Sequence, residues 1–271
     1  MAMPGTHPPR ILCIAGSDSG GGAGIQADIK TITRLGGHAM TAITAITAQN
    51  SLGVEAVELL APDLVIAQID AVARDIGVDA IKIGMIGSAE TAAAVAARLT
   101  AFDAALPIVF DPVMIASSGA ALADAVTIAL FERLMARATL VTPNLPELAA
   151  LVGDPLPDDA AIVAGARAVA ERCGAAMLVK GGHAEGEIVT DRLIGADGPI
   201  AHWSAPRIPT CHSHGTGCTL ASGIATGLGA GLGLERAIAR ARAFVRAALA
   251  VAPGYGAGHG PMGHATAAWP G

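Results

Sequence analysis

Short apolar segments alternate with amphipathic ones along most of the chain. Residues 10–15 (Arg-Ile-Leu-Cys-Ile-Ala) are almost entirely apolar and end at a glycine, which predicts a buried strand. Segments whose apolar residues recur every three or four positions predict helices instead. The predicted strands span 10–15, 39–47, 79–84, 107–111, 138–142 and 176–180. The predicted helices span 25–35, 63–76, 88–100, 121–136, 158–172, 219–228 and 235–251.

Two further strands are predicted at 187–194 and 200–205, joined as a hairpin around Asp197-Gly198. Repeated strand–helix units with short connections predict an α/β fold whose mostly parallel sheet is covered on both faces. Neither an internal repeat nor a linker divides the chain. We therefore expect one domain over residues 10–264, with a flexible N-terminus at 1–9 and a C-terminal tail at 265–271.

Composition limits which residues can form the core and which partners the protein can bind. Hydrophobic residues make up 52% of the chain and aromatic residues only 3%, so the core must consist of Ala, Val, Ile and Leu. A net charge of −6 argues against nucleic acid as a partner, because phosphate recognition needs a basic face. The start lacks a signal-peptide pattern, and glycines and polar residues interrupt the uncharged stretches 35–54 and 208–234, which argues against a membrane partner. With four cysteines and no C-x-x-C pair, we expect a soluble, reduced, cytoplasmic protein.

The sharpest motif is Gly215-Thr216-Gly217-Cys218, directly before a predicted helix. Open backbone N–H groups and the helix dipole make such a start suitable for a phosphate, or for the charge on a phosphoryl group during transfer. Cys218 falls in the first turn, where the pKa of a thiol is lowered, so it could accept a proton from an alcohol. A glycine-rich helix cap with a buried cysteine explains the same residues equally well.

A metal site is a second interpretation of this region. Cys211, His212, His214 and Cys218 are all of ligand type. The Gly-Thr-Gly segment separates Cys218 from the others, and no second cluster accompanies them, so this interpretation is disfavoured.

Three more motifs follow predicted strands, where ligands bind in parallel sheets. Lys180, beside two glycines, could reach nucleotide phosphates, although a glycine turn with a solvated lysine is the commoner meaning. Asn144 and Glu147 begin a further helix and could hold Mg²⁺ through its waters, whereas a helix N-cap with an early glutamate is the simpler explanation. Asp111 is another acid at a strand end.

The glycine-rich segment 16–28 lacks the Walker Lys-Ser/Thr and contains no G-x-G-x-x-G, so its glycines could instead let a substrate ring approach the backbone. Gln49 follows the strand predicted at 39–47 and offers one donor and one acceptor, which suits a ring nitrogen beside an amino group. A surface turn is the alternative for Gln49.

Taken in order from about residue 10 to about residue 264, these motifs resemble those of the hydroxymethylpyrimidine/phosphomethylpyrimidine kinases. The segments that carry the resemblance are SGGGAGIQAD, TAITAQNS, KIGMIGS, DPVM, TPNLPE, VKGGH, SAPRI, HGTGCTLAS and GHGPMGH. The resemblance implies a ribokinase-like three-layer α/β/α sandwich. It also implies a homodimer that uses MgATP to phosphorylate 4-amino-5-hydroxymethyl-2-methylpyrimidine, and then its monophosphate, in thiamine biosynthesis.

The resemblance assigns roles to the substrate pocket. Gln49 would hydrogen-bond the pyrimidine, and Gly16, Asp28 and the backbone of Met85 would line the same pocket.

It also assigns roles in phosphoryl transfer. Cys218 would act as the base, where the wider superfamily has an aspartate, and Gly215, Thr216, Gly217 and Cys218 would form an anion hole. The residues expected at ATP are Lys180, Asn144 and Thr216, and those expected to order Mg²⁺ and its waters are Asp111, Asn144 and Glu147.

Two other functions remain open from the sequence: a pyridoxine or pyridoxal kinase of the same superfamily, and a non-catalytic sensor of a pyrimidine or nucleotide. Gly223 departs from the family pattern, where alanine is expected, and would loosen its helix. The stretch 39–60 could supply a lid or a dimer strand, and the tail 253–271 could close over the nucleotide.

Overall fold

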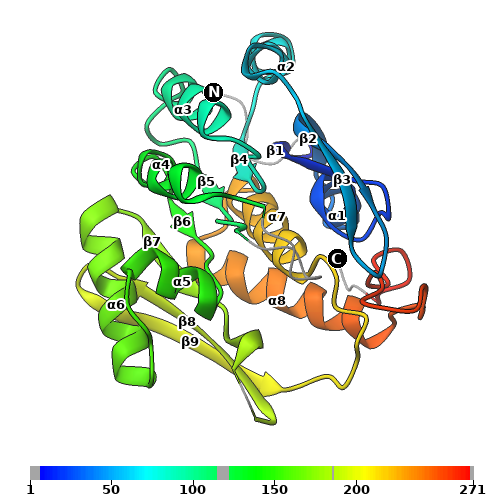
Figure 1. Ribbon diagram of the computed structural model, residues 1–271, viewed down its shortest axis with the longest axis vertical. Coiled ribbons are helices and arrows are strands. Elements are labelled where there is room, and N and C mark those ends of the chain that lie inside the picture. Colours follow the sequence, from blue (N-terminus) through cyan, green and yellow to red (C-terminus); the bar gives the residue numbers. More distant parts are fainter. Residues whose placement is uncertain (1–6, 115–121, 185, 269–271) are drawn as a thin grey trace.

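A single sheet runs through the computed structural model, which describes residues 7–114, 122–184 and 186–268 (Figure 1). The strands within these ranges are β1 (Arg10–Asp18), β2 (His38–Gln49), β3 (Val54–Leu59), β4 (Ala80–Ile83), β5 (Ile108–Phe110), β6 (Leu140–Val141), β7 (Ala176–Val179), β8 (Ile188–Gly195) and β9 (Gly198–Pro206). Their order across the sheet is β3-β2-β1-β4-β5-β6-β7-β8-β9. The expected flexible N-terminus falls mostly outside the described residues.

The centre of the sheet is parallel and both edges are antiparallel. β2, β1, β4, β5, β6 and β7 pair in parallel, whereas β3 pairs antiparallel with β2, and β8 and β9 extend the other edge as an antiparallel hairpin. The mostly parallel sheet and the hairpin around Asp197-Gly198 are therefore confirmed. β3 was not predicted as a separate strand, because its side chains are largely exposed and lack an apolar stripe.

Helices cover both faces of the sheet (Figure 1). Their bounds are α1 (Gly24–Arg34), α2 (Pro62–Asp75), α3 (Ala89–Leu99), α4 (Ala125–Met135), α5 (Leu145–Val152), α6 (Asp159–Cys173), α7 (Thr216–Gly229) and α8 (Leu234–Ala250), with a short 3₁₀ helix η1 (Gly181–His183). One core cluster joins the sheet to α2 through α6, and a second joins the opposite face to α1, α7 and α8. The three-layer α/β/α sandwich is thus confirmed.

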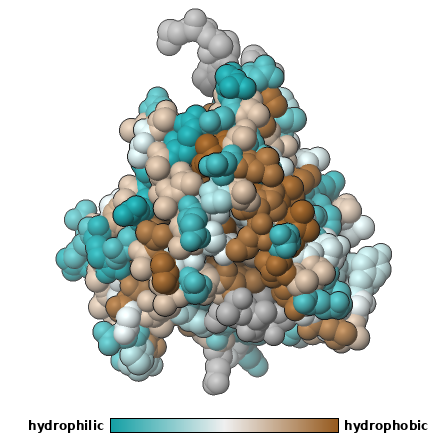
Figure 2. Space-filling model, turned by 45° about the horizontal axis from the view of Figure 1, so that its top comes forward, coloured by the Kyte–Doolittle hydropathy of each residue, from teal (hydrophilic) through white to brown (hydrophobic). Residues whose placement is uncertain are grey.

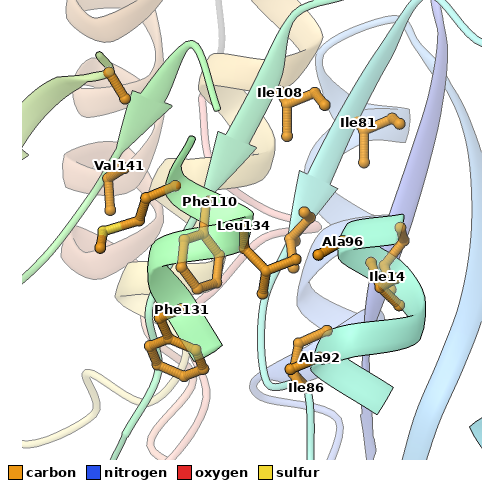
Figure 3. Close-up of a cluster of buried hydrophobic side chains, with 14 of the residues drawn as sticks. Ile14, Ile81, Ile86, Ala92, Ala96, Ile108, Phe110, Phe131, Leu134 and Val141 are labelled. Carbon is orange, nitrogen blue, oxygen red and sulfur yellow. The ribbon is translucent and has the colours of Figure 1, made fainter. Parts of the chain in front are cut away.

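The strands divide their side chains between these two clusters. Along β1, Leu12 and Ile14 enter the first cluster, whereas Ile11 and Cys13 enter the second, as the two-residue period of a strand requires. The core is mainly aliphatic, as the composition indicated. Phe110 and Phe131 provide an edge-to-face contact between β5 and α4, with ring centroids 5.1 Å apart (Figure 3).

The C-terminal segment packs onto the domain. Met262 and Ala267 are buried against Leu35 and Phe244, and a guanidinium nitrogen of Arg34 donates to the carbonyl oxygen of Ala267 at 2.8 Å. The described part of the tail is therefore part of the folded structure.

Exposed apolar side chains gather at the β3 edge. They include Ile46, Leu52, Val57 and Leu59 on or between β2 and β3, and Leu64 on α2. A broad hydrophobic area lies on the right of Figure 2, the side on which α2, β2 and β3 lie in Figure 1. Within the described ranges, none of the helices combines the length and hydropathy needed to cross a bilayer.

Candidate active site

A cavity of about 870 Å³ opens at the carboxyl ends of the parallel strands, where the topology predicts ligands. Its walls come from the ends of β1, β2, β4, β5, β6 and β7 and from the start of α7. It brings together almost all of the candidate residues, although they are widely separated in sequence. The candidates that line it are Gly16, Gln49, Met85, Asp111, Asn144, Glu147, Lys180, Gly215, Thr216, Gly217 and Cys218.

Asp28 is the exception, and the expectation that it lines the cavity is wrong. Its side chain is fully buried on the inner face of α1, where Oδ2 lies 2.9 Å from Nζ of Lys82, which is also fully buried. Burial raises the pKa of Asp28, and the nearby ammonium of Lys82 opposes that shift. The sequence signal for this pair is a lysine inside an otherwise apolar strand, Ala80–Ile83.

Lys180 stands at the centre of an ionic cluster in the cavity wall. Its Nζ lies 2.7 Å from Oδ1 of Asp111 and 3.7 Å from Oε2 of Glu147. Burial by itself would lower the pKa of Lys180, but the two carboxylates outweigh it and raise that pKa. The hydroxyl of Thr142 donates to the same Asp111 oxygen at 2.9 Å. The solvated-lysine interpretation is therefore wrong, and a charged ammonium faces the cavity.

Asn144 and Glu147 form a reciprocal cap at the start of α5. The backbone N–H of Glu147 donates to Oδ1 of Asn144 at 2.8 Å, and the backbone N–H of Asn144 donates to Oε2 of Glu147 at 2.8 Å. The simpler N-cap explanation is thus confirmed. Burial raises the pKa of Glu147, while Lys180 lowers it. The cap occupies one oxygen of Glu147 and fixes the carboxylate beside Asp111.

Two neighbouring carboxylates are the donors that Mg²⁺ takes when phosphate oxygens and water complete its shell. Asp111 and Glu147 both contact Lys180, so they fit such an ion shared with a bound phosphate. Among the described residues, no group of three or more His, Cys, Asp or Glu side chains could hold a metal by itself. The alternative cluster at Cys211, His212, His214 and Cys218 is accordingly not assembled: Cys211 is exposed, whereas His214 contacts Asp18.

Gly215 gives α7 its unusual start. Its φ of 84° lies in the left-handed region, and a Cβ there would meet the carbonyl oxygen of Gly22 at 1.8 Å, so only glycine fits. A Cβ on Gly217 would lie 3.2 Å from Nζ of Lys180. The first turn of α7, whose N–H groups have no partner inside the helix, therefore lies beside the Lys180 ammonium. Because Oδ2 of Asp111 lies 3.3 Å from the same Cβ position, the open N–H groups face the ion pair of Lys180 and Asp111.

Cys218 also lines the cavity, but its thiol differs from the expectation. Burial raises the pKa of Cys218 to about 11, although the nearby Lys82 ammonium acts in the opposite direction. The prediction of a lowered thiol pKa is therefore wrong, because burial outweighs the helix start. The thiol is protonated at neutral pH.

A second polar cluster connects three parts of the chain that sequence reasoning did not link. Nε2 of His214 lies 3.0 Å from Oδ2 of Asp18 and 3.0 Å from the side-chain amide of Gln49. All three side chains line the cavity. Asp18 lies in the glycine-rich opening segment and His214 directly precedes the Gly215 motif, but a residue type alone does not reveal a contact across 196 positions.

Comparison with known proteins gives one consistent family. Residues 18–263 match the family model described as phosphomethylpyrimidine kinase. The chain is 50% identical over 216 residues to the hydroxymethylpyrimidine/phosphomethylpyrimidine kinase of Rhizobium meliloti, covering 79% of this chain and 80% of that protein. It is 46% identical over 261 residues to the thiamine biosynthesis bifunctional protein ThiED of Geobacter sulfurreducens, covering 95% of this chain and 52% of that protein.

A solved structure is similar over the whole fold. Pyridoxal kinase from Staphylococcus aureus, in complex with AMP-PCP and pyridoxal, superposes with a TM-score of 0.85 at 30% identity, covering 96% of this chain and 94% of the other.

Proposed function

This chain belongs to the phosphomethylpyrimidine kinase family, and from that membership we propose that the cavity described above is its active site. The protein is a phosphotransferase that acts on hydroxymethylpyrimidine and its phosphate in thiamine biosynthesis. One observation carries the assignment of the site. The cluster of Lys180, Asp111 and Glu147 faces the glycine-rich start of α7 within a single cavity that also contains Gln49.

The pyrimidine binds at the β1–β2 side of this cavity. Gln49 offers its amide to the ring edge, and the ring lies against Gly16 and Met85, which line the same wall. A Cβ on Gly16 would come within 3.2 Å of the Met85 sulfur, so glycine keeps that wall open for a flat ring.

ATP binds at the opposite side, with Lys180, Asn144 and Thr216 at its phosphates. The ammonium of Lys180 and the N–H groups of Gly215–Cys218 neutralise the charge that spreads over the transferring phosphoryl group. Asp111 and Glu147 would hold Mg²⁺ through water, and the bound ion would neutralise the ATP phosphates further. The hydroxymethyl oxygen forms the new bond to the γ-phosphorus as the bond to the ADP oxygen breaks. The hydroxyl proton passes to Cys218 in those molecules whose thiol has first lost its own proton, because only the thiolate can accept it.

The base role of Cys218 is tested by substitution. Cys218→Ala should lower kcat by about 10²-fold or more, the range typical of a positioned general base. Cys173→Ala is the matched control, since Cys173 lies at the end of α6 and outside the cavity lining. Full turnover by Cys218→Ala would refute the base role while leaving the anion hole intact.

The overall activity is tested by ADP release with MgATP. Hydroxymethylpyrimidine, its monophosphate and pyridoxine are offered in parallel, and we expect strong turnover with the two pyrimidines and little with pyridoxine. Turnover mainly on pyridoxine would favour the second candidate, which the likeness to a pyridoxal kinase structure supports. Absence of turnover on all three would favour a non-catalytic sensor.

The working form we propose is a cytoplasmic homodimer. The exposed apolar residues of the β3 edge, among them Leu52, Val57 and Leu59, are the support for a contact with a second copy. Light scattering of the purified protein should give twice the chain mass of 26.8 kDa. A monomer at micromolar concentration would contradict this assembly.

A further inference from the structure

The proposed function gives no role to the contact that Asp18 and His214 make with Gln49. His214 is the last residue before Gly215, whereas Asp18 ends β1 and Gln49 ends β2. The side chains of His214 and Asp18 retain only 9% and 3% of their exposure. A charged or polar contact this well buried must be satisfied internally, so its hydrogen positions can be worked out atom by atom.

The hydrogen-bond partners of Asp18 determine whether Nε2 of His214 carries a hydrogen. Its carboxylate already accepts backbone N–H groups from Gly20, Gly22 and Ala23 at 2.8–2.9 Å. Burial by itself would raise the pKa of Asp18, but the bonds to His214 and to the backbone lower it, so the group is an ionised acceptor. The 3.0 Å contact between Oδ2 of Asp18 and Nε2 of His214 therefore requires the hydrogen to be on Nε2.

The hydrogen-bond partners of Thr47 determine which end of the Gln49 amide faces its hydroxyl. Its hydroxyl has one proton, and Oγ1 lies 3.0 Å from the carbonyl oxygen of Ser17, which can only accept. Oγ1 also lies 3.2 Å from one terminal atom of the Gln49 amide, toward which it therefore presents a lone pair. The other terminal atom of that amide lies 3.0 Å from Nε2 of His214. A protonated Nε2 has no lone pair to accept an N–H, so it can only share its single hydrogen between Asp18 and this atom of Gln49.

We propose that Asp18 and His214 are positioning residues, which hold the Gln49 amide with its oxygen toward His214 and its NH₂ group toward Thr47. The nitrogen and oxygen of an amide are distinguished by their hydrogen bonds, and only this orientation satisfies both neighbours. It leaves one lone pair and one N–H of Gln49 for a ligand. The inference rests on the proposed function in one respect, namely that Gln49 reads the pyrimidine edge.

This arrangement makes Gln49 selective instead of adaptable. An amide that is free to rotate accepts a ring edge with donor and acceptor in either order, whereas a fixed amide accepts only one order. A ring with a nitrogen beside an amino group satisfies the remaining lone pair and N–H together. A ring with no hydrogen-bond donor at that position leaves the lone pair of the Gln49 oxygen unpaired, which discriminates strongly.

The hydrogen-bond network is tested first without any substrate. Long-range ¹H–¹⁵N NMR of the ligand-free protein distinguishes the two imidazole tautomers, and His214→Gln identifies the signals of His214 by their loss. We expect a proton on Nε2. An unprotonated Nε2 would overturn the proposal whatever the enzyme phosphorylates.

Kinetics of matched variants test the consequence for the substrate. His214→Leu removes the donor and should raise KM for hydroxymethylpyrimidine about tenfold, the effect of losing one well-placed hydrogen bond, with kcat and the KM for ATP little changed. His214→Gln, whose amide N–H can replace Nε2–H, should recover most of the loss. Adding His214→Leu to Gln49→Leu should cost little more, because the two act through one contact.

Different results separate the possible failures. An equal fall in kcat and rise in the KM for ATP in His214→Leu would overturn the positioning role, because His214 would then act through the packing of Gly215. Lack of turnover on pyrimidines by the unmodified protein would refute the proposed function, and the tautomer measurement would still decide the network.

Discussion

The surroundings of the Cys218 thiol raise its pKa, whereas its position at the start of a helix would lower it. The start of a helix favours a thiolate, but Cys218 is partly buried in the cavity wall, and burial raises its pKa to about 11. A base at this position must therefore lose its proton before it can accept one from the substrate.

The pH dependence of kcat should follow from this pKa. If the thiolate of Cys218 is the base, log kcat should rise by about one for each pH unit between pH 7 and pH 10 and level off near pH 11, because the thiolate fraction grows tenfold per unit. Steady-state rates across this range, compared with Cys218→Ala, provide the measurement. A flat profile from pH 7 to pH 9 in the unmodified enzyme would exclude the base role.

The Asp28–Lys82 pair should matter for stability as well as for charge near the site. Lys82→Met leaves a buried carboxylate without its partner, which typically costs about 3–5 kcal/mol in the free energy of unfolding. Asp28→Leu combined with Lys82→Met should recover most of this loss. Urea denaturation of the three proteins measures it, and a loss below about 1 kcal/mol in Lys82→Met would indicate that the pair is not ionised.

At the scale of elements, α7 and α8 approach so closely that side-chain size decides their packing. A Cβ on Gly223 would lie 2.9 Å from Cβ of Ala241 and 3.4 Å from its Cα. The expectation that glycine loosens the helix is therefore incomplete. Gly223 lowers helix propensity, but it also allows α8 to lie against α7.

Gly223→Ala tests which effect wins. Alanine should gain about 1 kcal/mol in helix propensity and lose about 1–3 kcal/mol through overpacking, so we expect a net destabilisation. Thermal and urea unfolding of Gly223→Ala, Ala241→Gly and the double variant form a thermodynamic cycle. The double variant should be more stable than the two single effects predict, and additive effects would show that the helices are free to separate.

Most elements were predictable because their signals are local. Apolar runs located the central strands, and three-to-four-residue spacing located most helices within a few residues. For α5 only the start was predicted, from the motif that contains Asn144 and Glu147. The predicted start of α4 at residue 121 is wrong, because residues 122–124 are not helical and the helix begins at Ala125 with Asp124 as its N-cap. β3 lacked such a signal. Its place in the sheet comes from antiparallel pairing with β2, which no local pattern encodes.

The candidate site was predictable as a set of residues but not as a set of contacts. Motifs that follow strands must meet at one edge of a parallel sheet, so Lys180, Asp111 and Glu147 converge as expected. The burial of Asp28, the raised pKa of Cys218 and the contact of His214 with Gln49 depend on which side chains pack around each group. Such information is distributed over the whole chain.

At the scale of the whole molecule, His264 connects the C-terminal segment to the centre of the fold. Its Nε2 lies 2.8 Å from Oγ1 of Thr219 on α7, and its ring lies near Phe244 on α8. Burial, with a smaller contribution from Lys30, lowers the pKa of His264 to about 4. His264 is therefore harder to protonate in the folded protein than in the unfolded chain.

Acid should consequently weaken the fold before the carboxylates titrate. The unfolded histidine takes up its proton near pH 6.5, so the contribution of His264 is present above that pH and is lost between about pH 6.5 and pH 4, by up to about 3 kcal/mol. Unfolding free energies of the unmodified protein and His264→Gln should be compared across this range. Equal pH dependence in both proteins would contradict a neutral buried His264.

Because Asp18 and His214 are far apart in the sequence, they can come together only late in the synthesis of the chain. The ribosome completes β1 through β7 well before residues 213–218, yet α7 covers the face of β1, β4 and β5 and supplies Thr216, Gly217, Cys218 and Leu220 to the cavity wall. A nascent chain that ends after β9 would expose the second core cluster and lack the glycine-rich start of α7. Newly synthesised chains therefore cannot complete the cavity wall, or cover that apolar face, until α7 and α8 have left the exit tunnel.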